Sequence, residues 1–340
     1  MATMQLHEVN THGSHIYNNP RHGLRITGFV VLVVALAAAP LVAGEYQLHA
    51  LIVSMTFLLP ALGLNLILGY AGMLSFAQMA FFGIGAYSSA LTAMRWGTPF
   101  WLNLIIGGLA AGVVAVPLGI PALRLRRYSF VMCTLGFAVI AQTVAKNLVS
   151  VTRGDLGLSQ VPRPRIALWG GGFEVTGITS YYYLALTLAV LAVVAFLALV
   201  SSAAGRYMIA IREDETLAAS VGTPTWHYRM IAFALSAVFA GVGGSFYVHY
   251  FTVISPTVFD PFYANTVLVI VLGGGVGTVG GVVLGSFLFV AASEALRIAP
   301  DLRMIAYGLL LIVIVFACPE GLLPLFMRKL DGLKGRTHVA

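Results

Sequence analysis

The chain has 340 residues, of which 59% are hydrophobic and 9% are charged, and its mean hydropathy is +0.92. Soluble domains carry about a quarter charged residues, so this composition excludes a soluble protein and predicts an integral membrane protein in a lipid bilayer. The net charge of +7 does not indicate nucleic-acid binding, because the basic residues stand at the ends of apolar segments and do not gather on one polar face.

Apolar runs of spanning length recur along the chain, which predicts an all-α fold: a polytopic transmembrane helix bundle of about nine or ten membrane segments with Gly-rich breaks. Residues 1–24 come before the first run. They are polar, and the irregular spacing of their four histidines favours a solvated cytoplasmic tail over a metal site.

The first apolar run, Ile26 to Ala43, ends in small residues that mimic a signal-peptidase site. The polar region before it is longer than that of a signal peptide, and the run itself is close to spanning length. We therefore expect a retained first span.

The next two runs, Leu48 to Gly69 and Met73 to Met94, are separated by the sequence GYAG and contain polar residues. Polar side chains within such runs must face the bundle or an aqueous path, because lipid offers them no hydrogen bonds. They are candidates for lining a translocation path, and hydrogen bonding between helices is the alternative. These candidates are Asn65, Tyr70, Ser75, Gln78 and Tyr87.

Two more spans are expected at Trp101 to Leu123 and Tyr128 to Val149. A long hydrophilic connection follows, from Ser150 to Ser180. It is expected on the side of the membrane opposite to the polar segment Gly205 to Gly222. Further spans are expected at Tyr181 to Val200 and Trp226 to Tyr250.

A polar segment, Gly205 to Gly222, separates the last two of these spans and must lie outside the bilayer. Asp214 is the predicted N-cap of a short helix, and Glu215 adds negative charge to its first turn, where the helix dipole favours it. Gly222 can adopt the left-handed conformation that ends the helix.

The middle of this predicted helix is slim because Ala218 and Ala219 occupy it. A partner surface could therefore approach the helix backbone closely. The alternative is an ordinary solvated loop helix.

A Gly-rich string, GGGVGTVGG, follows the apolar run Phe262 to Leu272. Its glycines form one stripe if the segment is helical, or they mark a non-helical break between two half-length apolar pieces. We favour a break that continues into a close-packed helix. The residues of this predicted break are Gly273, Gly274, Gly275, Gly277 and Gly281.

Val282 to Leu296 and Met304 to Ala317 complete the predicted bundle, and residues 321–340 form a basic C-terminal tail. Whether 262–296 makes two crossings or a re-entrant segment plus one crossing stays open. With a cytoplasmic N-terminus and about ten crossings, about twice as many Lys and Arg residues fall inside as outside, in agreement with the positive-inside rule. This orientation places Gly205 to Gly222 in the cytoplasm.

Two motifs carry a resemblance to a known family. The run GRYMIAIREDETLAASVG resembles the cytoplasmic coupling loop of ABC-importer permeases, specifically the LivM type of the branched-chain amino acid permease family. The block Leu62 to Ala90 resembles that family's G-L-N-L-x-x-G-Y signature, with Gln78 where the family often has His. The resemblance implies that an ATPase contacts Arg206, Arg212, Glu213, Asp214, Glu215, Ala218, Ala219 and Gly222.

The resemblance implies a permease subunit of an ABC importer in the bacterial inner membrane, with a transmembrane domain at 25–320 and a coupling loop at 203–227. It would carry branched-chain amino acids, or a related small solute such as urea or amides, into the cytoplasm. The implied partners are cytoplasmic ATPase subunits, a second permease subunit of the LivH type and a periplasmic solute-binding protein, which would face the connection Ser150 to Ser180.

The chain contains no G-x-x-x-x-G-K-[ST] string, so ATP hydrolysis must come from a separate subunit. We expect no cofactor, no metal site and no catalytic residue, because paired acids, metal-spaced His or Cys residues and nucleophile constellations are missing from the sequence. The rival function is a secondary transporter driven by an ion gradient. That class commonly places a carboxylate near the membrane midplane, whereas Asp and Glu here fall almost entirely at segment ends.

Overall fold

The computed structural model describes residues 28, 31–168, 171–295, 309 and 321. These residues belong to two compact units, Met1–Ala43 and Gly44–Ala340, and each unit is considered by itself. In the first unit, Val31–Leu41 is an apolar helix that ends in the 3-10 turn η1 (Ala39–Leu41). The predicted tails at 1–24 and 321–340, except Gly321, and the predicted span Met304 to Ala317, except Leu309, lie outside the described residues.

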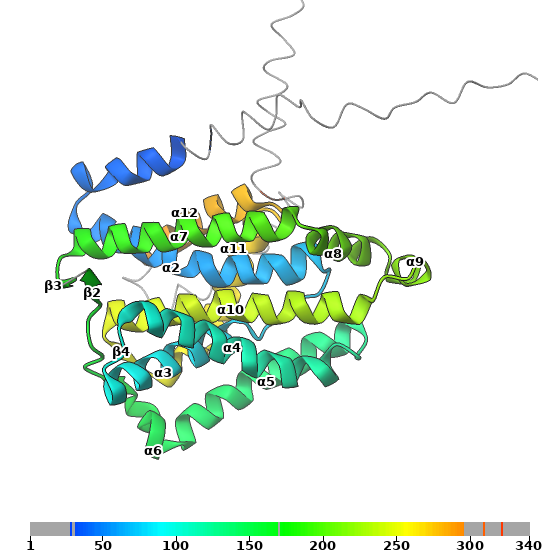
Figure 1. Cartoon of the computed structure of the whole chain (residues 1–340), viewed down its shortest axis with the longest axis horizontal. Coiled ribbons are helices and arrows are strands. Elements are labelled where there is room, and N and C mark those ends of the chain that lie inside the picture. Colours follow the sequence, from blue (N-terminus) through cyan, green and yellow to red (C-terminus); the bar gives the residue numbers. More distant parts are fainter. Residues whose placement is uncertain (1–27, 29–30, 169–170, 296–308, 310–320, 322–340) are drawn as a thin grey trace, which may run out of the picture. The chain divides into compact units, whose positions relative to one another are not determined.

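The second unit is a bundle of long helices, which Figure 1 shows running alongside one another. Among the described residues, five helical segments are long and apolar enough to cross a membrane. They are α2 with the π-helical turn η2 (Glu45–Asn65 and Leu66–Tyr70), α4 (Phe100–Ala122), α5 (Arg127–Asn147), α7 (Ile178–Ser201) and α10 (Thr225–Phe251). The prediction of an all-α membrane bundle is confirmed, and each of these helices matches a predicted span to within a few residues.

Helix α3 (Gln78–Trp96) begins later than the predicted start at Met73. Gly72 adopts a φ of +72°, and the following residues remain non-helical up to Gln78. The Ser75 hydroxyl accepts a hydrogen bond from the Ala77 amide at 3.2 Å, so this polar side chain stabilises the turn that precedes the helix.

Helices α3, α4 and α10 form the closely packed centre of the bundle. Glycines make this approach possible: a Cβ on Gly107 of α4 would lie 2.8 Å from Ser245 Cβ of α10, and one on Gly108 would lie 2.8 Å from Val242 Cγ2. Small residues have this function in membrane helices, because they let two backbones come near enough for extensive van der Waals contact.

The connection between α5 and α7 is more ordered than the predicted hydrophilic loop. It contains α6 (Val149–Thr152), the turn η3 (Gly154–Leu156) and a hairpin of β2 (Arg165–Leu168) with β3 (Gly171–Glu174). A further strand, β1 (Leu158–Ser159), pairs antiparallel with β4 (Val253–Ile254) just after α10. The buried His249 of α10 donates from Nδ1 to the Pro162 carbonyl at 2.9 Å, which joins this connection to the bundle.

The turn η4 (Pro256–Phe259) follows β4 and enters the bundle. The Phe259 ring stacks on Tyr87 of α3 with ring centroids 6.1 Å apart, and it also lies against Gly83. Helix α11 (Pro261–Gly274) therefore starts at the depth of the middle of α3.

The Gly-rich string is a break, as favoured from the sequence, and the single-helix alternative is wrong. Helix α11 ends at Gly274 and α12 (Val279–Ala295) begins four residues after Gly275, which has a φ of 125°. Gly274 lies against Gly281, and a Cβ on Gly285 would lie 2.5 Å from the Ile270 carbonyl oxygen. The two helices are therefore antiparallel.

The break is narrower than the predicted Gly273-to-Gly281 segment, because Gly273 and Gly274 complete α11 and Gly281 belongs to α12. The 14 residues of α11 measure about 21 Å, which is shorter than the roughly 30 Å hydrocarbon core.

Candidate functional site

The polar segment after α7 forms two helices instead of the one predicted: α8 (Ala203–Glu213) and α9 (Glu215–Ser220). Asp214 separates them, and its Oδ1 accepts a hydrogen bond from the Leu217 amide at 2.9 Å. Gly222 has a φ of 84°. The predicted N-cap and the predicted stop are both confirmed, because each depends on residues within one helical turn of it.

Helix α8 is held against the membrane bundle. Its inner face buries Gly205, Met208 and Ile211. The ring of Tyr207 stacks on Tyr228 of α10 with centroids 4.7 Å apart. These contacts fix α8 between α7 and α10, so a displacement of α8 must displace the ends of those helices.

Arg212, near the end of α8, reaches the carboxyl end of α2 with η2. Its Nη1 donates to the Gly69 carbonyl oxygen at 2.5 Å. Gly69 lies in η2, where the carboxyl end of the helix carries partial negative charge and favours a cation. π-helical turns of this kind are frequent at functional sites.

The same region holds the break between α11 and α12. Asn65 Oδ1 accepts a hydrogen bond from the Gly277 amide at 2.8 Å, and the Tyr70 hydroxyl donates to the Gly277 carbonyl at 2.9 Å. A Cβ on Gly277 would lie 3.3 Å from Arg212 Nη1 and 3.3 Å from the Gly69 carbonyl oxygen. We call Asn65, Gly69, Tyr70, Arg212 and Gly277 the Gly277 junction.

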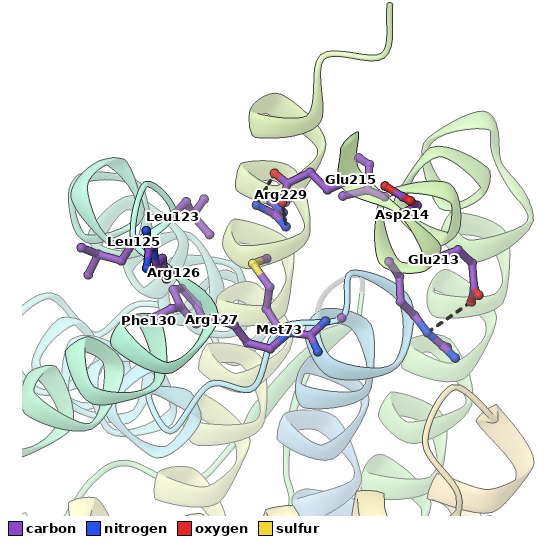
Figure 2. Close-up of a pocket in the computed structure, with 13 residues that line it drawn as sticks. Met73, Leu123, Leu125, Arg126, Arg127, Phe130, Glu213, Asp214, Glu215 and Arg229 are labelled. Atoms are coloured by element: carbon purple, nitrogen blue, oxygen red, sulfur yellow. Dashed lines mark hydrogen bonds and ion pairs between the residues drawn. The ribbon is translucent and has the colours of Figure 1, made fainter. Parts of the chain in front are cut away.

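A cavity of about 320 Å³ lies beside this junction and is lined by residues of both charges. Figure 2 shows Arg126 and Arg127, at the start of α5, on one side and Glu213, Asp214 and Glu215 on the other. The cavity thus lies between α8–α9 and the connection that joins α4 to α5.

Glu215 and Arg229 both line the cavity and form a bidentate ion pair. The distances from Arg229 Nη1 to Glu215 Oε1 and from Nη2 to Oε2 are both 2.5 Å. Because Arg229 belongs to the first turns of α10, this pair joins α9 to a membrane helix. The sequence predicted only that the charge of Glu215 would favour the first turn of its own helix.

The comparisons with known proteins identify the family. Residues 46–315 match the model for the branched-chain amino acid transport system / permease component. The chain belongs to this family. No solved structure matches it.

Relatives of this permease family cover most of the chain. It is 32% identical to the high-affinity branched-chain amino acid transport system permease protein LivM of Escherichia coli, over 87% of this chain and 75% of that protein. The identity to LivM of Salmonella typhimurium is 31%, over 91% and 77%. It is 26% to LivH of Escherichia coli, over 79% and 91%. The predicted LivM-type resemblance is confirmed, and the chain is a multi-pass membrane protein.

The predicted path residues of this permease do not gather in one place. Asn65 and Tyr70 hold the junction, and Ser75 caps the turn before α3. Gln78 Nε2 donates to the Pro60 carbonyl at 3.2 Å, while its Oε1 has no partner among the described residues. The buried Tyr87 hydroxyl also has none. A direct contact of any of the five with the solute stays a prediction.

Helix α9 of the permease turns Ala218 toward its own chain, whereas the sequence predicted that a partner surface approaches the helix at Ala218 and Ala219. Ala218 is only 5% exposed and packs inside the chain, so enlarging it would disturb the subunit itself. The outward residues are Leu217 and Val221, which are 64% and 75% exposed, together with Ala219. The order of apolar and polar residues in α9 does not predict that Ala218 is buried, because a six-residue helix is too short to have an apolar stripe that fixes its buried side.

We expect Glu215→Lys to loosen α9, because the lysine would face Arg229 and place positive charge at a helix amino terminus. The pair is partly exposed, so the expected cost is about 1 kcal/mol, or roughly fivefold faster hydrogen exchange at the Leu217 amide. The double variant Glu215→Lys with Arg229→Glu should restore much of the protection. Glu213→Lys is the control, since Glu213 is more exposed and lies 3.7 Å from Arg212 Nε. Equal exchange in both single variants would contradict the role of the pair.

Proposed function

We propose that this chain is the permease subunit of an ABC importer that moves branched-chain amino acids, or a related small solute, into the cytoplasm. The observation that carries the proposal is the family match over residues 46–315. Two of the relatives that cover most of the chain are permease proteins of a high-affinity branched-chain amino acid transport system.

In this proposal, cytoplasmic ATPase subunits supply the energy and dock on α8–α9. Two features support this location. The segment is polar and lies at an end of the bundle, and Leu217 of α9 and the C-cap residue Val221 are exposed as apolar anchors. A periplasmic solute-binding protein would dock at the opposite end, on the connection that β1 and β4 tie to α10, and the assembly would lie in the bacterial inner membrane.

The Gly277 junction connects α8 to the membrane helices, so a movement of α8 can be transmitted to them. If an ATPase displaces α8, Arg212 pulls on the end of η2, where Gly69 lies against the α11–α12 break. Hydrolysis would then shift the population between two arrangements of the bundle, because the two differ in how well they hold the ATPase.

A secondary transporter is less well supported. Helices α3, α4, α5, α7 and α10 contain no Asp or Glu. Ion-driven carriers commonly place such a group near the midplane, where it binds the coupling ion.

The decisive experiment is uptake into proteoliposomes that contain this chain with its ATPase subunits, its LivH-type partner and its solute-binding protein. We expect ATP-dependent uptake of radiolabelled leucine, isoleucine or valine, with urea and acetamide as competitors to test the related solutes. The isolated chain should bind no ATP, since it has no phosphate-binding loop. Uptake driven by a proton or sodium gradient without ATP, or micromolar ATP binding by the isolated chain, would contradict the proposal.

A further inference from the structure

The cavity beside the Gly277 junction has the size and the lining of a small-molecule site. Its volume of about 320 Å³ falls at the lower end of the range for such sites, roughly 300–1,000 Å³. Four of its lining residues are apolar and buried in the chain, namely Met73, Leu123, Phe130 and Ile211. Small-molecule sites combine an apolar wall of this kind with a few charged groups that orient the ligand. The charged groups that line the cavity therefore decide which ligand fits.

Two walls of the cavity keep unpaired charge of opposite sign. The guanidinium groups of Arg126 and Arg127, at the start of α5, form no ion pair and no hydrogen bond among the described residues. The Asp214 carboxylate forms no ion pair in the described part of the chain either, and it accepts one hydrogen bond, from the Leu217 amide. Figure 2 shows the two arginines and Asp214 on opposite sides. A ligand between them must therefore carry both charges or leave one wall unpaired.

Arg229 supplies an independent sign that the cavity takes a ligand. Its Nη1 and Nη2 are held by Glu215, but its Nε is buried and has no hydrogen-bond partner among the described residues. A buried donor of a charged group is costly to leave unpaired, so native structures place an acceptor against it. Since Arg229 lines the cavity, an occupant with a negatively charged oxygen would supply that acceptor.

The chemistry of the lining selects one class of ligand. An anion such as phosphate would face the Asp214 carboxylate, and a cation would face Arg126 and Arg127, so each would meet like charge. A zwitterion satisfies both walls, because its carboxylate accepts charge-assisted hydrogen bonds from guanidinium groups and its ammonium donates to a carboxylate. The buried apolar lining favours a zwitterion with an apolar side chain. An α-amino acid of the leucine type carries these three groups on one small frame.

We propose that this cavity binds a free α-amino acid with an apolar side chain, and that the bound amino acid slows import by joining α8–α9 to the start of α5. Its carboxylate would lie toward Arg126, Arg127 and Arg229, and its ammonium toward Asp214. The inference rests on the proposed function for the source of the ligand, which is the imported solute after its release into the cytoplasm. Import would then slow when the cytoplasm already holds enough of the solute.

The cavity lies on the bundle side of the docking segment. Ile211, on the buried inner face of α8, lines it, whereas Leu217 and Val221, the proposed anchors for the ATPase, do not. An ATPase held by these anchors need not fill the cavity. A ligand that contacts both α8–α9 and α5 stabilises the arrangement that binds it, so it opposes the displacement of α8 that the proposed coupling requires.

The first test measures which ligand binds. The purified full-length chain in phosphatidylglycerol nanodiscs is titrated by calorimetry, without ATP or other subunits, and L-leucine is expected to bind. Leucinamide lacks the carboxylate, isocaproate lacks the ammonium and glycine lacks the apolar side chain, so each should bind at least about tenfold more weakly. No binding of L-leucine, or equal binding of leucinamide, would overturn the proposal.

Phosphatidylethanolamine is the other source of a zwitterion, since its headgroup carries a phosphate and an ammonium at the membrane surface. The same titration in nanodiscs to which this lipid has been added separates the two sources. The affinity for L-leucine is expected to stay unchanged. A large loss of affinity would identify the headgroup as the occupant and overturn the amino-acid assignment.

The second test locates the bound leucine. Arg126→Gln combined with Arg127→Gln should weaken L-leucine binding about ten- to a hundredfold, because charge-assisted hydrogen bonds to the carboxylate are lost. Arg126→Lys combined with Arg127→Lys should be intermediate, since lysine keeps the charge but not the planar fork. Both pairs of side chains are exposed, so the Tm measured without leucine should stay at the wild-type value.

Arg124→Gln is the matched control for this test. Arg124 is exposed on the same connection between α4 and α5 but does not line the cavity, so its replacement should leave the affinity for leucine unchanged. Wild-type affinity in the double Gln variant, or an equal loss in Arg124→Gln, would show that leucine binds elsewhere and would overturn the site.

The third test measures regulation in proteoliposomes of the complete importer, with ATP and L-leucine enclosed on the side of the ATPase. Enclosed leucine should lower the initial rate of solute-stimulated ATP hydrolysis in the wild type. The double Gln variant should have the same rate without enclosed leucine, and it should need about ten to a hundred times more leucine for half-inhibition. Equal inhibition of the two proteins would overturn the regulatory role. The binding tests use the chain alone, so a failed uptake assay leaves the site untouched, and an absence of binding leaves the proposed importer untouched.

Discussion

Gly277→Val is expected to abolish uptake, because valine fits neither the backbone nor the surroundings of this position. Gly277 has a φ of 77°, a region that costs an L residue about 1–2 kcal/mol and a β-branched one more. A Cβ would also meet Arg212 and the Gly69 carbonyl at 3.3 Å, and overpacking adds about 1–3 kcal/mol. The summed cost of roughly 2–5 kcal/mol falls on the contact that joins α2 to the α11–α12 break.

The control variant Gly97→Val separates the backbone cost of a positive φ from the cost of overpacking. Gly97 ends α3 with a φ of 60°, but an added Cβ meets nothing within 4 Å, so only the backbone cost remains. Uptake in proteoliposomes and the Tm of each purified variant are the measurements. We expect Gly97→Val to lower the Tm modestly and keep most of the uptake. A similar loss of uptake in both variants would mean that the contacts of Gly277 with Arg212 and Gly69 do not contribute to transport.

Arg212→Ala is expected to uncouple ATP hydrolysis from uptake while the ATPase subunits still co-purify. Arg212 donates inward to Gly69, so its removal leaves the outward face of α9 intact. The guanidinium side chain is 41% exposed, which limits the loss to about 1–2 kcal/mol, and solute transported per ATP should fall about tenfold. Arg212→Lys should be intermediate, because lysine keeps the charge but not the planar fork.

Two further variants separate this role from a general effect of charge on α8. Arg206 lies on the same helix, but its Nη1 donates to the nearby Ser201 carbonyl at 3.2 Å, so Arg206→Ala should keep the wild-type ratio of transport to hydrolysis. Tyr70→Phe removes the hydroxyl that holds Gly277. The double variant Tyr70→Phe with Arg212→Ala should lower the ratio of transport to hydrolysis by less than the sum of the two single effects, since both residues act on one junction. Additive effects of Tyr70→Phe and Arg212→Ala would contradict the proposal that the Gly277 junction couples ATP hydrolysis to transport. Uncoupling by Arg206→Ala would contradict it as well.

The sequence by itself determined the class of protein and most of its local structure. Apolar runs long enough to span a bilayer predicted α2, α4, α5, α7 and α10, because a membrane helix satisfies its backbone hydrogen bonds within one segment. Asp214 and Gly222 marked the start and stop of α9 correctly, since capping involves residues only a turn apart. The break between α11 and α12 was also predicted, although the structure places it within a shorter stretch.

The tertiary structure alone decided which of these elements meet. Gly277 is more than two hundred positions from Asn65 and Tyr70, and nothing in the spacing of the sequence indicates that their polar groups satisfy its amide and its carbonyl. The inward burial of Ala218 and the pairing of Glu215 with Arg229 were missed for the same reason. Periodicity fixes which side of a helix is apolar, but all sides of these helices are apolar, so the choice of neighbour depends on close packing and on hydrogen bonds formed only in the folded bundle.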